Sequence, residues 1–215
     1  MSNPSRRQGR GGRPPREPEQ KDAVRAQILL AARRLIVEDG FRALSIRKLA
    51  SEIQYSPAAI YLYFESREAI ARELCLQGYR ELLRCLHVAI QATADPQANL
   101  RACFAAYVNF GLSEVETYRL IFIDEPEYLA AAFANWPADN PATQAYRLLL
   151  DVAQAVLCVD GGEPPRLSVV EFAETCWAAM HGIVSLKLTC PAFPTTPVEV
   201  LGRSTVELLL RGLRS

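Results

Sequence analysis

Residues 22–70 contain several residues, close together, that typically start or end helices. They predict short helices joined by tight turns in this part of the chain. Apolar residues recur at three- and four-residue spacing from Val24 to Ile36, which predicts an amphipathic helix. The residues suited to helix ends are Gly40, Ser45, Ser56 and Ser66. Pro57 takes the first position of the third helix, where its missing N–H costs nothing. Two middle helices of about eight residues, joined by a tight turn, predict a helix-turn-helix.

The predicted helix-turn-helix corner is rich in side chains that suit DNA phosphates. These are Arg47, Lys48, Tyr61, Tyr63 and Arg67. Residues 1–70 also hold 13 Lys and Arg against 8 Asp and Glu, whereas residues 71–215 hold 11 against 16. A basic front end joined to an acidic remainder favours a polyanionic partner for the front end. The alternative is a helical hairpin that only packs against the rest of the chain.

Residues 1–20 are rich in Arg, Gly and Pro and lack apolar periodicity, so they are predicted to form a flexible arm. The five arginines of this arm either add phosphate or minor-groove contacts or belong to a solvated tail without a role. The sequence leaves both interpretations open.

Helical patterns continue to the C-terminus. The predicted helical segments are 67–94, 100–111, 114–123, 127–135, 141–158, 167–188 and 197–213. Pro and Gly mark the breaks between them, most clearly in DGGEPPR at 160–166. Because no alternating strand pattern and no internal repeat occurs in the sequence, the fold is predicted to be all-α.

The segment ILLAARRLIVEDGFRALSIRKLASEIQYSPAAIYLYFESREAI, residues 28–70, resembles the N-terminal domain of the TetR family of transcriptional regulators. The elements that match in order are the apolar first helix, Gly40-Phe41, Ser45-Ile46-Arg47, Leu49-Ala50, Ser56, Tyr61, Phe64 and Arg67. One departure is Gln54 in the turn, where the family often has Gly. A left-handed Gln there costs about 1 kcal/mol and predicts a slightly remodelled turn.

The resemblance implies a helix-turn-helix DNA-binding domain over residues 21–66 and a larger helical ligand-binding and dimerisation domain over residues 67–215. It implies a homodimer that presents its third helices to the two halves of an inverted repeat in double-stranded DNA. A small molecule in the second domain would release the DNA, which describes a ligand-responsive regulator acting as a repressor. The alternatives are a transcriptional activator with the same head or a helical protein-interaction module.

Base recognition in this scheme falls to small side chains. Those of Pro57, Ala58 and Ala59 suit thymine methyl groups better than guanine edges, so Ser45 and Arg47 would supply polar contacts, with help from DNA shape. By the family pattern, Tyr61 and Arg67 are the strongest candidates for phosphate contacts. The full predicted DNA-binding set is Ser45, Arg47, Lys48, Ser56, Pro57, Ala58, Ala59, Tyr61, Tyr63 and Arg67.

The last two predicted helices carry the signals of a dimer interface. TCWAAMHGIVSLKL, residues 175–188, resembles the Trp-to-His-Gly segment of one AcrR-like subset of the family. The small residues that permit close helix approach there are Ala178, Ala179, Gly182 and Ser185. The apolar face of the final helix comprises Leu201, Val206, Leu208, Leu209 and Leu213. Two such helices from each subunit would form a four-helix interface, unless both faces are buried within one subunit.

Aromatic side chains between the helices predict a pocket for a small, largely apolar effector. His181, one turn after Trp177 on an apolar stripe, is the sharpest candidate. The full predicted ligand-binding set is Phe104, Tyr107, Phe122, Trp136, Tyr146, Trp177 and His181. Each of these residues, taken singly, also fits ordinary core packing.

Other classes of function lack the residues that they need. The chain has two histidines and no Gly-rich phosphate loop, H-E-x-x-H helix or G-x-S-x-G elbow, so no enzymatic activity is expected. Its six cysteines form no C-x-x-C pair, which predicts reduced, mostly buried thiols in a cytoplasmic protein without a metal or other cofactor. Charges interrupt every long apolar stretch, so no membrane span is predicted. The effector, the operator and the regulated genes are not readable from the sequence.

Overall fold

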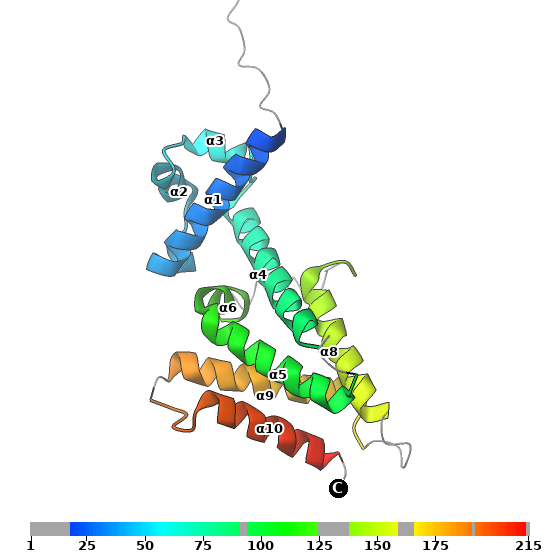
Figure 1. The fold of residues 1–215 in the computed structure, drawn as a ribbon. Coiled ribbons are helices and arrows are strands. Elements are labelled where there is room, and N and C mark those ends of the chain that lie inside the picture. Colours follow the sequence, from blue (N-terminus) through cyan, green and yellow to red (C-terminus); the bar gives the residue numbers. More distant parts are fainter. Residues whose placement is uncertain (1–17, 91–93, 124–137, 159–165, 191, 214–215) are drawn as a thin grey trace, which may run out of the picture.

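Every regular element that the structure describes is a helix (Figure 1). The structure is a computed structural model that describes residues 18–90, 94–123, 138–158, 166–190 and 192–213. Its elements are α1 (Pro18–Asp39), η1 (Phe41–Ala43), α2 (Ile46–Glu52), α3 (Pro57–Tyr61), α4 (Arg67–Ile90), α5 (Pro96–Ser113), α6 (Val115–Phe122), α8 (Pro141–Cys158), α9 (Val169–Thr189) and α10 (Val198–Gly212). The prediction of an all-α fold is confirmed.

The first three α-helices and η1 form an N-terminal head around a small apolar core (Figure 1). Ile28 of α1, Leu49 of α2 and Ile60 of α3 are completely buried. Burial of each such side chain contributes about 1.5–3 kcal/mol, which holds short helices that would be unstable alone.

Two residues with positive φ make the corners of the head. Gly40 has a φ of 78° after α1, a conformation that glycine adopts without strain. Gln54 has a φ of 56° between α2 and α3, so the left-handed turn inferred for this residue is confirmed. The short 3-10 turn η1, which the sequence pattern does not predict, follows Gly40 and buries Phe41.

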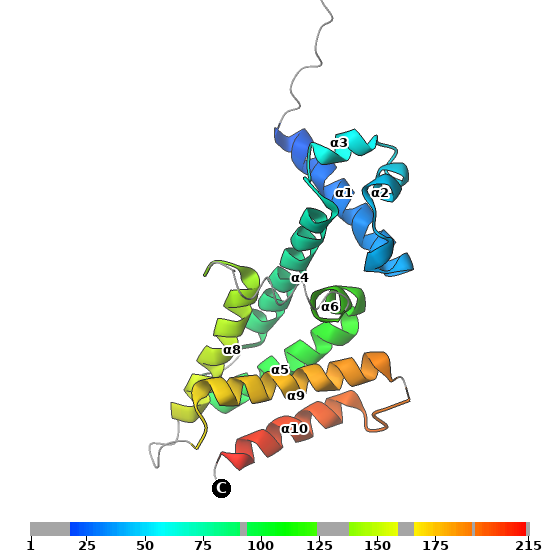
Figure 2. The same cartoon turned by 180° about the vertical axis from the view of Figure 1, so that it is seen from behind.

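Helix α4 leaves the head and runs into the larger, C-terminal group of helices, where it packs against α5, α6 and α8 (Figures 1 and 2). Two glycines permit close helix crossings in this group. A Cβ atom added at Gly78 of α4 would lie 2.8 Å from Thr117 Cγ2 of α6. One added at Gly111 of α5 would lie 2.5 Å from Val184 Cγ1 of α9. The missing side chains therefore let α6 pack closely against α4, and α9 pack closely against α5.

Helices α9 and α10 lie side by side at the end of the molecule farthest from the head (Figures 1 and 2). The large apolar side chains exposed on these two helices are Val170, Leu186, Val200 and Leu208. Gly182 lies on the open side of α9, because an added Cβ would meet nothing within 4 Å. The expectation that Val206 belongs to an outward face is wrong, since it is 2% exposed and packs into the core of its own subunit.

Several boundaries differ from the sequence expectation. Helix α1 begins at Pro18, within the segment expected to be a flexible arm, because Pro is tolerated in a first helical turn. The rest of that arm, the helix predicted at 127–135 and most of the loop at 160–166 lie outside the described residues. Within the described ranges, no helix has an apolar run long enough to cross a bilayer.

Candidate functional site

Serine side chains fix the start of the helices in the helix-turn-helix corner. Ser45 Oγ accepts a hydrogen bond from the Lys48 N–H at 3.2 Å, and Ser56 Oγ accepts one from the Ala59 N–H at 3.1 Å. Both serines therefore act as the predicted N-caps, each of which typically stabilises a helix by about 1 kcal/mol. Because each hydroxyl accepts from the backbone, its own proton is left to donate outward.

The outer surface of the corner combines small and phosphate-contacting side chains from adjacent helices. Arg47 of α2 is exposed, as are Pro57 and Ala58 of α3. Tyr61, at the end of α3, is 55% exposed, whereas Ala59 is half-buried. This surface combines the exposed cation of Arg47 with small apolar groups, which is the chemistry expected of the predicted DNA contacts.

Two of the predicted cations are engaged within the head. Lys48 Nζ forms an ion pair with Asp39 at the end of α1. Arg67 donates to the Leu44 carbonyl oxygen at 3.5 Å, and its guanidinium carbon lies 5.0 Å from the centroid of the Phe41 ring. Arg67 thus fastens the start of α4 to the turn before α2. Tyr63 is half-buried, so the corner exposes less of this predicted set than the sequence indicates.

Leu62 and Gln54 are two exposed residues of the corner that do not belong to the DNA-binding set predicted from the sequence. Leu62 is 81% exposed at the C-terminal end of α3, although an apolar residue in a helical pattern favours the core. Gln54 is exposed at the left-handed turn between α2 and α3. No periodic signal marks either residue, because both lie where a short helix ends.

The head is tied to α4 by a cluster around Arg25 of α1. Its guanidinium donates to the Tyr63 carbonyl oxygen at 3.3 Å and forms an ion pair with Glu73 at 3.0 Å. The same group lies 4.3 Å from the centroid of the Phe64 ring. A second link joins α1 to α6, where Arg33 donates to Thr117 Oγ1 at 3.5 Å. Side-chain contacts therefore link both α4 and α6 to α1 of the head.

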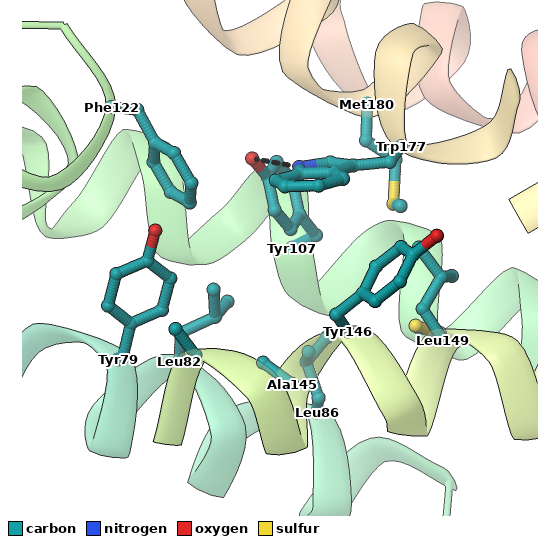
Figure 3. A pocket seen from close by; sticks show the side chains of 12 residues that line it. Tyr79, Leu82, Leu86, Tyr107, Phe122, Ala145, Tyr146, Leu149, Trp177 and Met180 are labelled. Atoms are coloured by element: carbon teal, nitrogen blue, oxygen red, sulfur yellow. Dashed lines mark hydrogen bonds between the residues drawn. The ribbon is translucent and has the colours of Figure 1, made fainter. Parts of the chain in front are cut away.

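An apolar cavity lies among α4, α5, α6, α8 and α9 (Figure 3). Its lining residues are Tyr79, Leu82, Leu86, Cys103, Tyr107, Phe122, Ala142, Ala145, Tyr146, Leu149, Trp177 and Met180. Tyr79 and Phe122 lie at one side of the cavity, and Tyr146 and Leu149 lie at the other (Figure 3). The cavity leaves about 30 Å³ for the centre of a water-sized molecule. This space is small beside that of a usual ligand pocket, so a drug-sized ligand must displace side chains.

A hydrogen-bonded chain of aromatic residues borders the cavity. Trp177 Nε1 donates to the Tyr107 hydroxyl oxygen at 3.1 Å, the contact drawn in Figure 3. The Tyr107 oxygen lies 3.4 Å from His181 Nδ1, and the Tyr118 oxygen lies 2.6 Å from the same nitrogen. The chain thus joins α5, α6 and α9 at the cavity wall.

Burial keeps this chain uncharged. It lowers the pKa of His181 from 6.5, and it raises the pKa of Tyr118 to about 12. Burial, and then the nearby Tyr118, raise the pKa of Tyr107 well above 10.0. Each shift disfavours the charged form of its group, as expected for a site removed from water.

Four of the predicted ligand-binding residues line the cavity: Tyr107, Phe122, Tyr146 and Trp177. His181 lies behind this wall and bonds to Tyr118. Phe104 does not belong to the cavity; it is 1% exposed and borders a groove between α5 and α10. Trp136 lies outside the described residues. The contribution of α4 was not predicted, because its apolar residues have the spacing of any buried helix stripe.

The six cysteines are all free thiols, of which three are buried, Cys85 is half-buried and two are exposed, Cys158 and Cys190. The expectation of buried thiols is therefore wrong for the two exposed ones, which lie at the ends of α8 and α9. Across the described ranges, no cluster of three or more His, Cys, Asp or Glu side chains is arranged to hold a metal ion.

A helix-turn-helix head on a larger helical body is an architecture typical of DNA-binding transcriptional regulators. Residues 28–74 match the family model for bacterial regulatory proteins of the tetR family, and residues 100–212 match that for a tetracyclin repressor-like C-terminal domain. The chain belongs to the TetR family of transcriptional regulators.

Relatives of this chain include proteins of known structure and function. The HTH-type transcriptional activator FasR of Mycolicibacterium smegmatis is 29% identical over 125 residues, which are 56% of this chain and 55% of that protein. The match thus spans about half the length of FasR. The fatty acid degradation regulator FadR of Bacillus halodurans has the same fold, with a TM-score of 0.71 and 16% identity over 88% of this chain and 96% of that one. FadR of Bacillus subtilis, solved with stearoyl-CoA, has a TM-score of 0.69 and 15% identity over 87% and 98%.

Proposed function

We propose that the protein regulates transcription by binding an operator through its head and releasing it when a small molecule enters the α4–α9 cavity. The observation that carries this proposal is the course of α4. Its first residue, Arg67, contacts the turn before α2, while Tyr79, Leu82 and Leu86 farther along the same helix line the cavity. Because one helix touches both sites, a ligand that widens the cavity displaces the head.

The size of the cavity supports this coupling. Ligand pockets usually have volumes of about 300–1,000 Å³, and this cavity leaves about 30 Å³ for the centre of a water-sized molecule. An effector therefore needs α4, α8 or their side chains to move. The ion pair between Arg25 and Glu73 would transmit a shift of α4 to α1.

For the DNA contacts, we assign different tasks to different parts of the corner. Arg47 and Tyr61 are the exposed residues suited to phosphate or polar base contacts, and Pro57 and Ala58 offer small apolar surfaces to base edges. Lys48 and Arg67 would have to leave or share their present partners to reach a phosphate. Their first role in this scheme is to hold the corner rigid.

The proposed regulator acts as a homodimer through α9 and α10. Support comes from the exposed apolar side chains of these helices and from the open space around Gly182, which permits close approach of a second α9. A dimer would present two heads to an inverted repeat, with a spacing that depends on α4 in both subunits. Because its proposed partner is DNA, the protein is expected in the cytoplasm.

The test is a binding titration with DNA from the region next to the protein's own gene, at several salt concentrations. Specific binding should weaken steeply as salt rises, since phosphate contacts release counterions. Stearoyl-CoA, which FadR of Bacillus subtilis holds on the same fold, is a suitable first effector probe. Absence of a sequence-selective complex on every neighbouring promoter would contradict the proposal.

Activation instead of repression is the second candidate, and the relative FasR favours it because that protein is a transcriptional activator. The two outcomes use the same head and cavity. In vitro transcription from a bound promoter separates them: a repressor lowers transcript yield when it binds, and an activator raises it.

A further inference from the structure

The described residues that line the cavity differ in their access to solvent. Most of them are buried, including every one that α4 and α5 contribute. The exceptions are Phe122 of α6, Tyr146 of α8 and Trp177 of α9, which are half-buried. These three aromatic rings therefore form the side of the cavity that faces solvent, and we call them the aromatic wall.

The rings of the aromatic wall stand in a row, with Trp177 at its centre (Figure 3). The centroid of the Trp177 ring lies 6.4 Å from that of Phe122 and 6.0 Å from that of Tyr146. A molecule that enters the cavity from this side has to displace at least one of the three rings.

Two rings of the wall are held from inside the protein. Trp177 Nε1 donates to the hydroxyl oxygen of Tyr107, which is 3% exposed, at 3.1 Å. The Phe122 ring contacts the buried rings of Tyr79 and Tyr118, with centroids 5.7 Å and 4.9 Å away. Displacing either ring would break contacts within the core, which solvent does not replace.

Tyr146 is instead held from outside. Its hydroxyl donates to a Glu174 carboxylate oxygen at 3.1 Å, and Glu174 is exposed on α9, three residues before Trp177. Water competes for both partners of an exposed hydrogen bond, so this bond costs less to break than a buried one. Tyr146 is therefore the ring of the aromatic wall that moves outward most readily.

From this arrangement we propose that Tyr146 is the gate through which an effector enters the cavity, between α8 and α9, and that its hydrogen bond to Glu174 is the latch of this gate. The inference rests on the proposed effector role of the cavity. It adds the route of entry and the contact that sets how often the cavity opens. Outward rotation of Tyr146 would also add the space of its ring to the small cavity, so that entry and enlargement occur together.

The thiol of Cys103 on α5 can report the opening of this gate without any effector. Cys103 lines the cavity and is 1% exposed, so a reagent reaches it only when the protein opens. Methyl methanethiolsulfonate is a small, uncharged reagent that transfers its methylthio group to a cysteine thiolate and releases methanesulfinate. The labelling rate of Cys103 in the full-length protein is measured by mass spectrometry of the tryptic peptide 102–119.

Cys75 provides an internal control in the same sample. It is buried on α4, does not line the cavity and falls in a separate tryptic peptide, 73–80. Its labelling rate reports opening of the whole fold, whereas that of Cys103 reports opening of the whole fold or of the cavity.

Glu174→Ala removes the latch from outside the cavity, and Tyr146→Phe removes it while keeping the ring. Each change should raise the labelling rate of Cys103 about two- to fivefold, the effect of losing one exposed hydrogen bond, and should leave that of Cys75 unchanged. The double variant should label no faster than the single ones, because both changes break the same bond. Glu174→Gln keeps an acceptor oxygen and should label more slowly than Glu174→Ala.

Asp151→Ala is the matched control, since it removes an exposed carboxylate of α8 that does not line the cavity, and it should label like the parent protein. Parental rates for Cys103 in Glu174→Ala and Tyr146→Phe would overturn the proposal. So would an equal acceleration of Cys75, or additive effects in the double variant.

Labelling needs neither an effector nor DNA, which keeps this inference distinct from the proposed function. A latch-dependent labelling rate, with an operator complex that stearoyl-CoA leaves intact, would support the gate and count against regulation through the cavity. Release of DNA by stearoyl-CoA, with a labelling rate that is independent of the latch, would support regulation and overturn the inference.

Discussion

The hydroxyl oxygen of Tyr118 on α6 lies 2.6 Å from Nδ1 of His181 on α9, and the two rings stack with centroids 5.6 Å apart. This pair joins the helix that contacts the head through Thr117 to a helix of the expected dimer face. Burial lowers the pKa of His181 and so favours the neutral imidazole. Protonation of His181 therefore costs free energy in the folded protein.

A first prediction is that acidification destabilises the protein through His181. Burial lowers the pKa of His181 in the folded state below the 6.5 of an ordinary histidine, so the unfolded chain binds the proton more readily. The free energy of unfolding should therefore fall as pH drops below 6.5 and level off once the folded histidine is also protonated. Melting temperatures measured at pH values from above 6.5 to below it check this.

His181→Gln should remove most of the slope in this window, whereas His87→Gln should preserve it. His87 is the other histidine of the chain and is exposed on α4, so it is a matched control. Parallel pH profiles for the parent protein and His181→Gln would contradict the assignment.

A second prediction concerns the crossing of α5 and α9. Gly111→Ala should lower the free energy of unfolding by about 1–3 kcal/mol, because the added Cβ would lie 2.5 Å from Val184 Cγ1. Gly182→Ala, where nothing of the same subunit lies within 4 Å, should not strain the subunit itself, but its Cβ would hinder the proposed approach of a second α9. Urea unfolding at several protein concentrations separates the two effects, because only the contribution of dimerisation depends on concentration. A Gly111→Ala protein as stable as the parent would show that α5 and α9 can separate freely.

The sequence predicts the head better than the cavity, for a physical reason. Caps such as Ser45 and Ser56 act within one turn, so their bonding partners lie three residues away and can be inferred from spacing. The cavity instead depends on which faces of distant helices meet. The aromatic residues Tyr107 and Phe104 are three residues apart on α5, yet Phe104 faces the groove beside α10.

The sequence also does not show which cations of the corner are paired within the fold. Arg47, Lys48 and Arg67 are equivalent in a sequence pattern, but two of them have partners in the fold. The partners, Asp39 and the Leu44 carbonyl, lie at the end of α1 and before α2, and no local spacing marks them. Tertiary contacts therefore decide which cations are available to a ligand.

A third prediction tests the strained turn of the head. Gln54 adopts a φ of 56°, which side chains with a Cβ disfavour, so Gln54→Gly should exceed Gln54→Ala in stability by about 1 kcal/mol. Comparison with Ala is needed because glycine also increases the entropy of the unfolded chain. Urea unfolding of the two variants measures the difference. Equal stabilities would mean that the turn relaxes to another conformation.

A fourth prediction separates the two arginines of the corner. Arg47 is exposed on α2, so Arg47→Ala should change the free energy of unfolding by less than about 0.5 kcal/mol. Arg67→Ala should lower it by about 1–2 kcal/mol, because it removes the hydrogen bond to Leu44 and the contact with the Phe41 ring. Thermal and urea unfolding of each protein provide the comparison.

DNA binding by Arg47→Ala tests whether Arg47 contacts the operator. Arg47→Ala should weaken operator binding and reduce the slope of log affinity against log salt concentration by about one if Arg47 contacts a phosphate. If it contacts a base, the variant should also discriminate less between the operator and a scrambled sequence. Uniformly weaker binding with discrimination intact would show that Arg47 reads no base. Base recognition would then rest on the small surfaces of Pro57 and Ala58 and on the shape of the DNA.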